Sequence, residues 1–179
     1  MKLRSSCAGA MLAGVAAIAL AGCQQKAGEA AAGNVEGQLP ISINAVMVGT
    51  VSHSADYIFA LSNGDFPRND HDWDLVRSAA YETMLGGKVI QIPGTGSNDA
   101  NWVTQPEWKG YADQLTVLGG EAVKLVDERS TDKAKWSALG GQLVDDCLAC
   151  HMKFKPEIPS QGILHGSTER ESRGISIFD

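Results

Sequence analysis

Apolar residues recur at three- and four-residue steps over most of the chain after residue 38. This spacing is typical of amphipathic helices, whereas no long stretch alternates apolar and polar residues as a half-buried strand would. The pattern predicts four helices, over about residues 39–61, 70–92, 106–128 and 133–155. Because short or moderate loops join them, an antiparallel up-down-up-down arrangement is favoured. The sequence therefore predicts an all-α fold, an antiparallel four-helix bundle.

Local signals indicate where these helices begin and end. Asn69 and Asp70 can cap the second helix, and Thr104-Gln105-Pro106-Glu107 has the pattern of a capping box that opens the third. Residues 93–103, rich in Gly, Asn and Asp, are predicted to form a loop. The Gly86-Gly87 pair costs helix stability, so it marks either an early helix end or a place where a cofactor or another backbone comes close.

The same spacing predicts which side chains face the core. Each predicted helix carries one apolar stripe, and in the last helix that stripe continues into a cysteine-rich segment. The stripes are Ile43, Met47, Val51, Ser54 and Ile58 in the first helix, Val76, Ala80 and Met84 in the second, Tyr111, Leu115, Leu118, Ala122 and Leu125 in the third, and Trp136, Leu139, Leu143, Cys147, Cys150, His151 and Phe154 in the last.

The beginning of the chain has the order of regions found in a bacterial secretory signal. Lys2 and Arg4 precede an apolar run of 14 residues, from 7 to 20, which is shorter than the roughly 20 residues of a membrane-spanning helix. Leu20-Ala21-Gly22-Cys23 resembles the lipobox of bacterial lipoproteins. We therefore expect residues 1–22 to be a signal peptide and Cys23 to carry a lipid; the alternative is an ordinary cleavage site followed by a spare cysteine.

Composition and charge define the rest of the organisation. Residues 23–38 contain almost nothing that could form a core and are predicted to be a flexible tether. The bundle is expected over residues 39–155, and an irregular tail over 156–179. Without Lys2 and Arg4 the chain keeps 13 basic and 21 acidic side chains, a net charge of −8, so nucleic acid is not an expected partner.

Two of the four cysteines form a motif with a specific chemistry. Cys147-Leu148-Ala149-Cys150-His151 is a CxxCH string, the pattern of covalent haem c attachment. On a helix its side chains advance by about 300° and then about 100°, which gathers both sulfurs and the imidazole on one face. A zinc site would need two further ligands, for which His53, His71 and His165 are available. A thioredoxin-like site would require an alternating strand-helix chain, which the pattern does not show.

The layout resembles the cytochrome c′ family, or class II c-type cytochromes, including low-spin relatives of the c556 type. The resemblance covers about residues 39–155 and consists of four helices, CxxCH near the end of the last one, and an aromatic residue soon after it, Phe154. It implies one covalent haem c, His151 as the proximal iron ligand, a haem between the first and last helices, and frequent homodimerisation.

The second axial position of the iron is left open between two interpretations. Met152 is adjacent to His151 and cannot reach across the ring, so the residue must come from upstream or from the tail. Met47 is on the first helix's apolar stripe, where the resemblance places a ligand or a packing residue. Thioether ligation would raise the reduction potential, whereas a merely packed Met47 would leave an open iron. His53 is about 240° around the helix from Met47, so both cannot face the haem.

These features favour a membrane-anchored electron carrier over an enzyme. No Ser/His/Asp set and no phosphate loop are present, and the acidic balance suggests a basic redox protein as partner. The alternatives are a gas-binding (NO/CO) high-spin protein, and the haem subunit of a larger respiratory complex that uses the tail as a contact segment. The expected location is the periplasmic side of a bacterial membrane, with the outer membrane slightly favoured because Gln24 follows Cys23.

Overall fold

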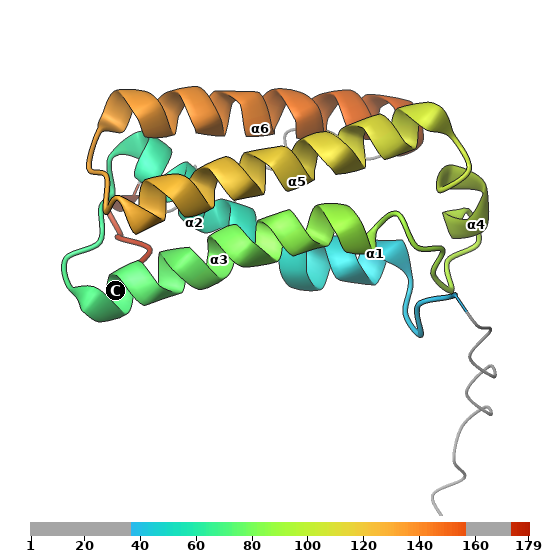
Figure 1. Cartoon of the computed structure of the whole chain (residues 1–179), viewed down its shortest axis with the longest axis horizontal. Helices are drawn as coiled ribbons and strands as arrows, with labels where there is room; N and C mark the ends of the chain where they lie inside the picture. Colours follow the sequence, from blue (N-terminus) through green and yellow to red (C-terminus); the bar gives the residue numbers. More distant parts are fainter. Residues whose placement is uncertain (1–36, 157–172) are drawn as a thin grey trace, which may run out of the picture. The chain divides into compact units, whose positions relative to one another are not determined.

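Every regular element in the computed structural model, which describes residues 37–156 and 173–179, is helical. The all-α prediction is therefore confirmed for this part of the chain. The predicted signal peptide, Cys23 and residues 157–172 lie outside the described residues. In chain order the elements are α1 (Ile43–Val46), the π-helix η1 (Met47–Val51), α2 (Ser52–Asn63), α3 (Asp70–Val89), α4 (Asp99–Trp102), α5 (Pro106–Asp127) and α6 (Lys133–Phe154) (Figure 1).

The long helices pack in a closed cycle of neighbours. α3 packs on α5, α5 on α6, α6 on α2, and α2 on α3, and Figure 1 shows α3, α5 and α6 lying side by side with α2 behind them. Their shared interior is apolar, which provides the main favourable free energy of folding. None of the described helices combines the length and the apolar character that a membrane span requires. The most completely buried large side chains include Trp136, Ile58, Leu61, Leu118, Leu143 and Val76.

The helix starts agree with the sequence signals in one place and differ in another. The side chain of Asn69 caps α3 by accepting a hydrogen bond from the backbone N–H of Asp72, at 3.0 Å. The predicted capping box is wrong: Gln105 is the N-cap of α5 without a side-chain bond, and the Thr104 hydroxyl donates to the carbonyl of Asn101 at 2.8 Å. Thr104 is engaged there because the predicted loop 93–103 contains the short helix α4.

The glycine pair of α3 marks a close approach between helices, because the helix continues past it to Val89. A Cβ atom at Gly86 would lie 2.5 Å from Val51 Cγ2, and one at Gly87 would lie 2.4 Å from the carbonyl oxygen of Ala112. Real Cβ atoms essentially never come this close, so η1 and α5 can reach α3 only where α3 has glycine.

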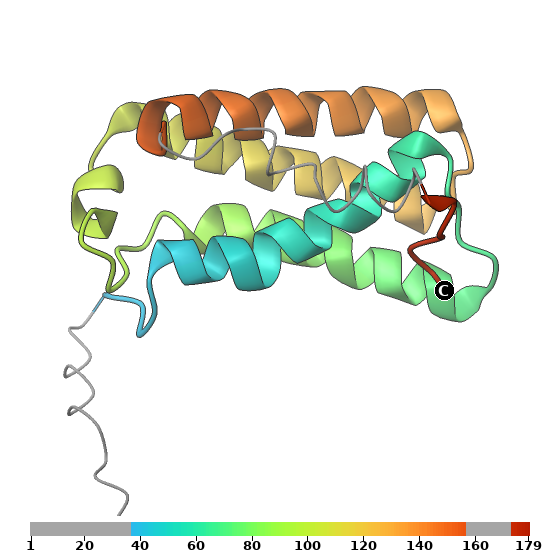
Figure 2. The same ribbon diagram turned by 180° about the vertical axis from the view of Figure 1, so that it is seen from behind.

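The first predicted helix is a composite of α1, η1 and α2. It starts at Ile43, where the Ser42 hydroxyl accepts from the backbone N–H of Ala45 at 3.1 Å, and it contains a π-turn in which the Ser52 N–H donates to the Met47 carbonyl. Figure 2 shows this segment running obliquely, from beside α3 at the end near α4 to beside α6 at the other end. A regular helix over 39–61 was therefore the wrong expectation in detail.

The last residues of the chain bind the loop between α2 and α3; we call residues 176–179 the C-terminal clasp. Asp65 accepts hydrogen bonds from the Ser176 hydroxyl at 2.9 Å and from the Ile177 N–H at 2.7 Å. Arg68 donates to the Asp179 carboxylate at 2.7 Å and also to the Phe178 carbonyl. The predicted tail is thus held in place over its final residues.

Candidate cofactor-binding site

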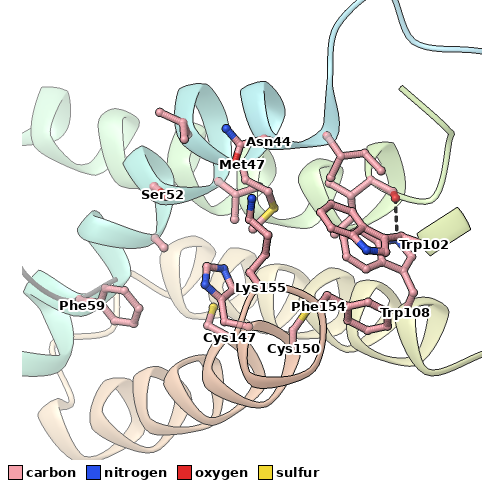
Figure 3. Close-up of a pocket in the computed structure, with 16 residues that line it drawn as sticks. Asn44, Met47, Ser52, Phe59, Trp102, Trp108, Cys147, Cys150, Phe154 and Lys155 are labelled. Atoms are coloured by element: carbon pink, nitrogen blue, oxygen red, sulfur yellow. Dashed lines mark hydrogen bonds between the residues drawn. The ribbon is translucent and has the colours of Figure 1, made fainter. Parts of the chain in front are cut away.

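A cavity of about 280 Å³ lies between the first helical segment and the C-terminal half of α6. All four residues predicted to hold a cofactor, Met47, Cys147, Cys150 and His151, line it. Figure 3 shows Met47 on one side and Cys147 and Cys150 on the other. The remaining lining residues are Ile43, Asn44, Val48, Val51, Ser52, Ala55, Phe59, Ile90, Trp102, Trp108, Phe154 and Lys155, most of them apolar.

The α6 wall presents the CxxCH motif as one surface. Cys147, Cys150 and His151 are half-buried, and both cysteines are free thiols. Helical spacing accounts for this surface, since positions three and four apart share a helix face. The motif occupies the last two turns of α6, which ends at Phe154.

The two thiols are neutral at physiological pH. Burial raises the pKa of each thiol to about 12, and the negative charge of Asp146 acts in the same direction. A redox-active dithiol works through a thiolate whose pKa is lowered, so this environment is opposite to that of a thioredoxin-like site. In residues 37–156 and 173–179, no three His, Cys, Asp or Glu side chains are grouped so that they could hold a metal ion.

His151 is available as a ligand. Its Nδ1 atom is buried and has no hydrogen-bond partner among the described residues. Burial lowers the pKa of the imidazole, and the positive charge of Lys155 lowers it further. His151 is therefore held in the neutral form, which is the form that binds a metal.

Aromatic side chains close the end of the cavity near α4. Trp102 and Trp108 stack with ring centroids 5.1 Å apart, and Phe154 meets Trp108 edge to face at 5.0 Å. Trp108 also donates its indole N–H to the carbonyl of Ile90 at 2.8 Å, and Lys155 Nζ lies 5.8 Å from the Trp102 ring. Trp102 reaches this wall from α4, and Trp108 reaches it from the first turn of α5.

The other candidates lie elsewhere. His53 is exposed, with its ring 5.8 Å from that of Tyr57, and His71 is an exposed residue in the first turn of α3. Neither lines the cavity. Met84 packs beside Gly119 of α5, away from the cavity, and Trp136 is fully buried. His165 and the predicted lipid site Cys23 fall outside the described residues.

Ala55 and Phe59 also line the cavity, although neither was among the predicted site residues. They continue the series Ile43, Met47 and Val51 at steps of four residues, a spacing that a regular α-helix would not keep on one face. Comparison of the chain with protein-family models, with curated proteins and with solved structures gave no significant match.

Proposed function

We propose that this protein is a c-type cytochrome that carries electrons, with one haem c in the cavity between Met47 and His151. One observation supports this proposal most strongly. Met47 and the Cys147–His151 motif are about 100 positions apart in the sequence, yet they line the same apolar cavity. A chance CxxCH string has no reason to face a cavity with a thioether in its opposite wall.

The residues present fit a haem by their chemistry. Cys147 and Cys150 supply two unpaired thiols for the thioether bonds, and His151 supplies a neutral imidazole nitrogen without another partner among the described residues. The cavity is lined mostly by apolar side chains, with a few polar groups among them, as cofactor sites usually are. A bound haem would supply one-electron chemistry, while the apolar walls and the aromatic cluster at Trp102 and Trp108 would limit water around it.

We further propose that the helices form an antiparallel four-helix bundle of the cytochrome c′ kind, lipid-anchored through Cys23 on the periplasmic side of a bacterial membrane. The cycle of helix contacts supports the first part, and the sequence of residues 1–23 supports the second. The partner is then a redox protein. Homodimerisation remains a prediction from the resemblance.

The first experiment tests attachment. The full chain is produced in a bacterial host competent for haem maturation, alongside Cys147→Ser/Cys150→Ser and a control, His53→Ala, which changes a histidine outside the cavity. We expect the wild-type chain and the control to carry one haem that survives denaturation, and the double variant to carry none. A colourless wild-type chain whose two thiols react with an alkylating reagent would reject the proposal.

The second experiment separates electron transfer from gas binding. We expect a low-spin ferric spectrum with a methionine-to-iron charge-transfer band that is lost in Met47→Ala. Met84→Ala is the matched control, because Met84 is also a half-buried helical methionine but does not line the cavity. A high-spin spectrum of the wild-type protein, with rapid CO binding by the ferrous form, would instead favour the gas-binding function.

A further inference from the structure

Five residues of the first helical segment line the cavity at strict four-residue steps: Ile43, Met47, Val51, Ala55 and Phe59. A straight α-helix turns by about 100° per residue, so positions 16 apart point about 160° away from each other. Ile43 and Phe59 could not line one cavity from such a helix. Some part of the segment must therefore contain more than the roughly 3.6 residues per turn of an α-helix.

The π-turn η1 supplies this extra length. It covers Met47–Val51, and its hydrogen bond runs from the Ser52 N–H to the Met47 carbonyl, five residues back rather than four. A π-turn contains one more residue than an α-turn and occurs mostly as a single turn, often at functional sites. Here the additional residue reduces the angle of about 160° between Ile43 and Phe59, so that both halves of the segment face the cavity.

The segment is anchored on both sides of this turn. Upstream, the Ile43 N–H donates to the buried carboxylate of Asp99 at 2.8 Å. Downstream, Val51 fits against Gly86, and the fully buried hydroxyls of Ser54 and Thr83 lie 3.0 Å apart in a hydrogen bond between α2 and α3. Because the downstream anchor is fully buried, the number of residues in η1 decides which upstream side chain faces the cavity.

We propose that η1 acts as a register device: its additional residue places Met47, rather than Val46, at the position opposite His151. This inference rests on the proposed function, since it concerns the second axial side of the haem. Gly49 is the residue whose removal tests it most simply. It is exposed, and a Cβ atom built on it would meet nothing within 4 Å.

Deleting Gly49 should convert the π-turn into an α-turn and move each upstream residue one place along the helix. Val46 would then occupy the present position of Met47, and Met47 would move to that of Val48, which borders the cavity at its solvent side with a side chain that is 65 % exposed. The deletion should therefore abolish ligation by Met47, although it substitutes no side chain and only shifts the lining residues upstream of Gly49 by one place. A methionine placed at position 46 should restore ligation in the shortened helix.

The experiment uses four chains purified with haem: wild type, Gly49 deletion, Val46→Met/Met47→Val, and the last two changes combined. The methionine-to-iron band should be present, absent, absent and present, in that order, with unchanged helical content by circular dichroism. Deletion of Gly37, which lies before α1 and outside the helix, is the control and should keep the band.

The outcomes separate this inference from the proposed function. A wild-type chain without haem rejects the function itself, and a Met47→Ala variant that keeps the band rejects ligation by Met47. If Met47→Ala loses the band but the Gly49 deletion keeps it, the register device is rejected. Failure of both deletion variants to fold would also overturn it, because the inference requires that an α-turn can replace the π-turn.

Discussion

The two halves of α6 face the same neighbouring segment and pack against it in opposite ways. In the N-terminal half, Gly140 lies so close to α2 that a Cβ atom on it would be 2.1 Å from Ser62 Oγ, and Trp136 is fully buried. In the C-terminal half, Cys147 and Cys150 are half-buried and border the cavity. One helix thus has a closed end and an open end.

Direct hydrogen bonds hold the closed end together. Ser62 Oγ donates to the Trp136 carbonyl at 2.8 Å, and Ser137 Oγ donates to the Ser62 carbonyl at 2.7 Å. At the open end, the first helical segment packs on α3 instead, with Val51 against Gly86. Gly140 and Gly86 therefore determine where the first helical segment packs closely on α6 and on α3. The cavity lies where this segment diverges from α6. The cavity is therefore a product of helix crossing rather than of small side chains.

The largest difference between the two ends should appear on truncation of an aromatic residue. Trp136→Ala should lower the free energy of unfolding by about 3–5 kcal/mol, because it leaves a hole in a filled core. Met47→Ala should cost less than about 2 kcal/mol, since one side of that half-buried side chain already borders a cavity. Chemical denaturation of the haem-free chains measures both values; equal losses would show that the two ends do not differ in packing.

A matched pair of glycines on α6 tests the close approach at the closed end. Gly140→Ala should destabilise the protein by about 1–3 kcal/mol, because the new methyl group would overlap Ser62. Gly141→Ala meets nothing within 4 Å and should stabilise the helix by about 0.5–1 kcal/mol. Denaturation midpoints of the two variants decide this, and a stabilising Gly140→Ala would be inconsistent with the observed contact.

The open end also contains an acid whose charge is unfavourable. Burial raises the pKa of Asp146 from 3.8 to about 6, so the folded chain binds more protons than the unfolded chain between these values and its stability falls as the pH rises through them. Because the carboxylate is partly solvated, the effect should stay below about 1 kcal/mol.

Asp146→Asn should accordingly stabilise the haem-free protein at pH 7.5 but not at pH 4. Its exposed neighbour Asp145 provides the control, because Asp145→Asn removes the same charge from α6 without removing a buried carboxylate. Denaturation curves of both variants at the two pH values are required. A gain for Asp146→Asn that is the same at pH 4 would rule out titration of this group as the cause.

The smallest expected effect concerns the C-terminal clasp. A chain that ends at Gly174 loses the contacts to Asp65 and Arg68 and the packing of Phe178 on Tyr57. Since the ion pair is largely exposed and such pairs contribute little, Tm should fall by no more than about 2–4 °C. A loss of stability as large as that caused by Trp136→Ala would mean that the clasp is part of the core.

Local patterns in the sequence were sufficient to predict three of the long helices and the residues that α6 contributes to the cavity. The expected helices over 70–92, 106–128 and 133–155 correspond to α3, α5 and α6 within three residues at each end, because apolar periodicity reports directly which face of a helix is buried. Cys147, Cys150 and His151 could be assigned from their spacing alone, since three residues within five positions share a helix face whatever surrounds that helix.

The tertiary structure alone decided what lies opposite that face. The π-turn at Met47–Val51, the wall formed by Trp102 and Trp108, and the clasp on Asp65 and Arg68 all depend on contacts between residues far apart in the chain. No local propensity specifies them, because a π-turn is stable only when both of its flanks are anchored elsewhere. The sequence determined which chemical groups the last helix offers, and helix packing determined that they face a cavity with Met47 in its opposite wall.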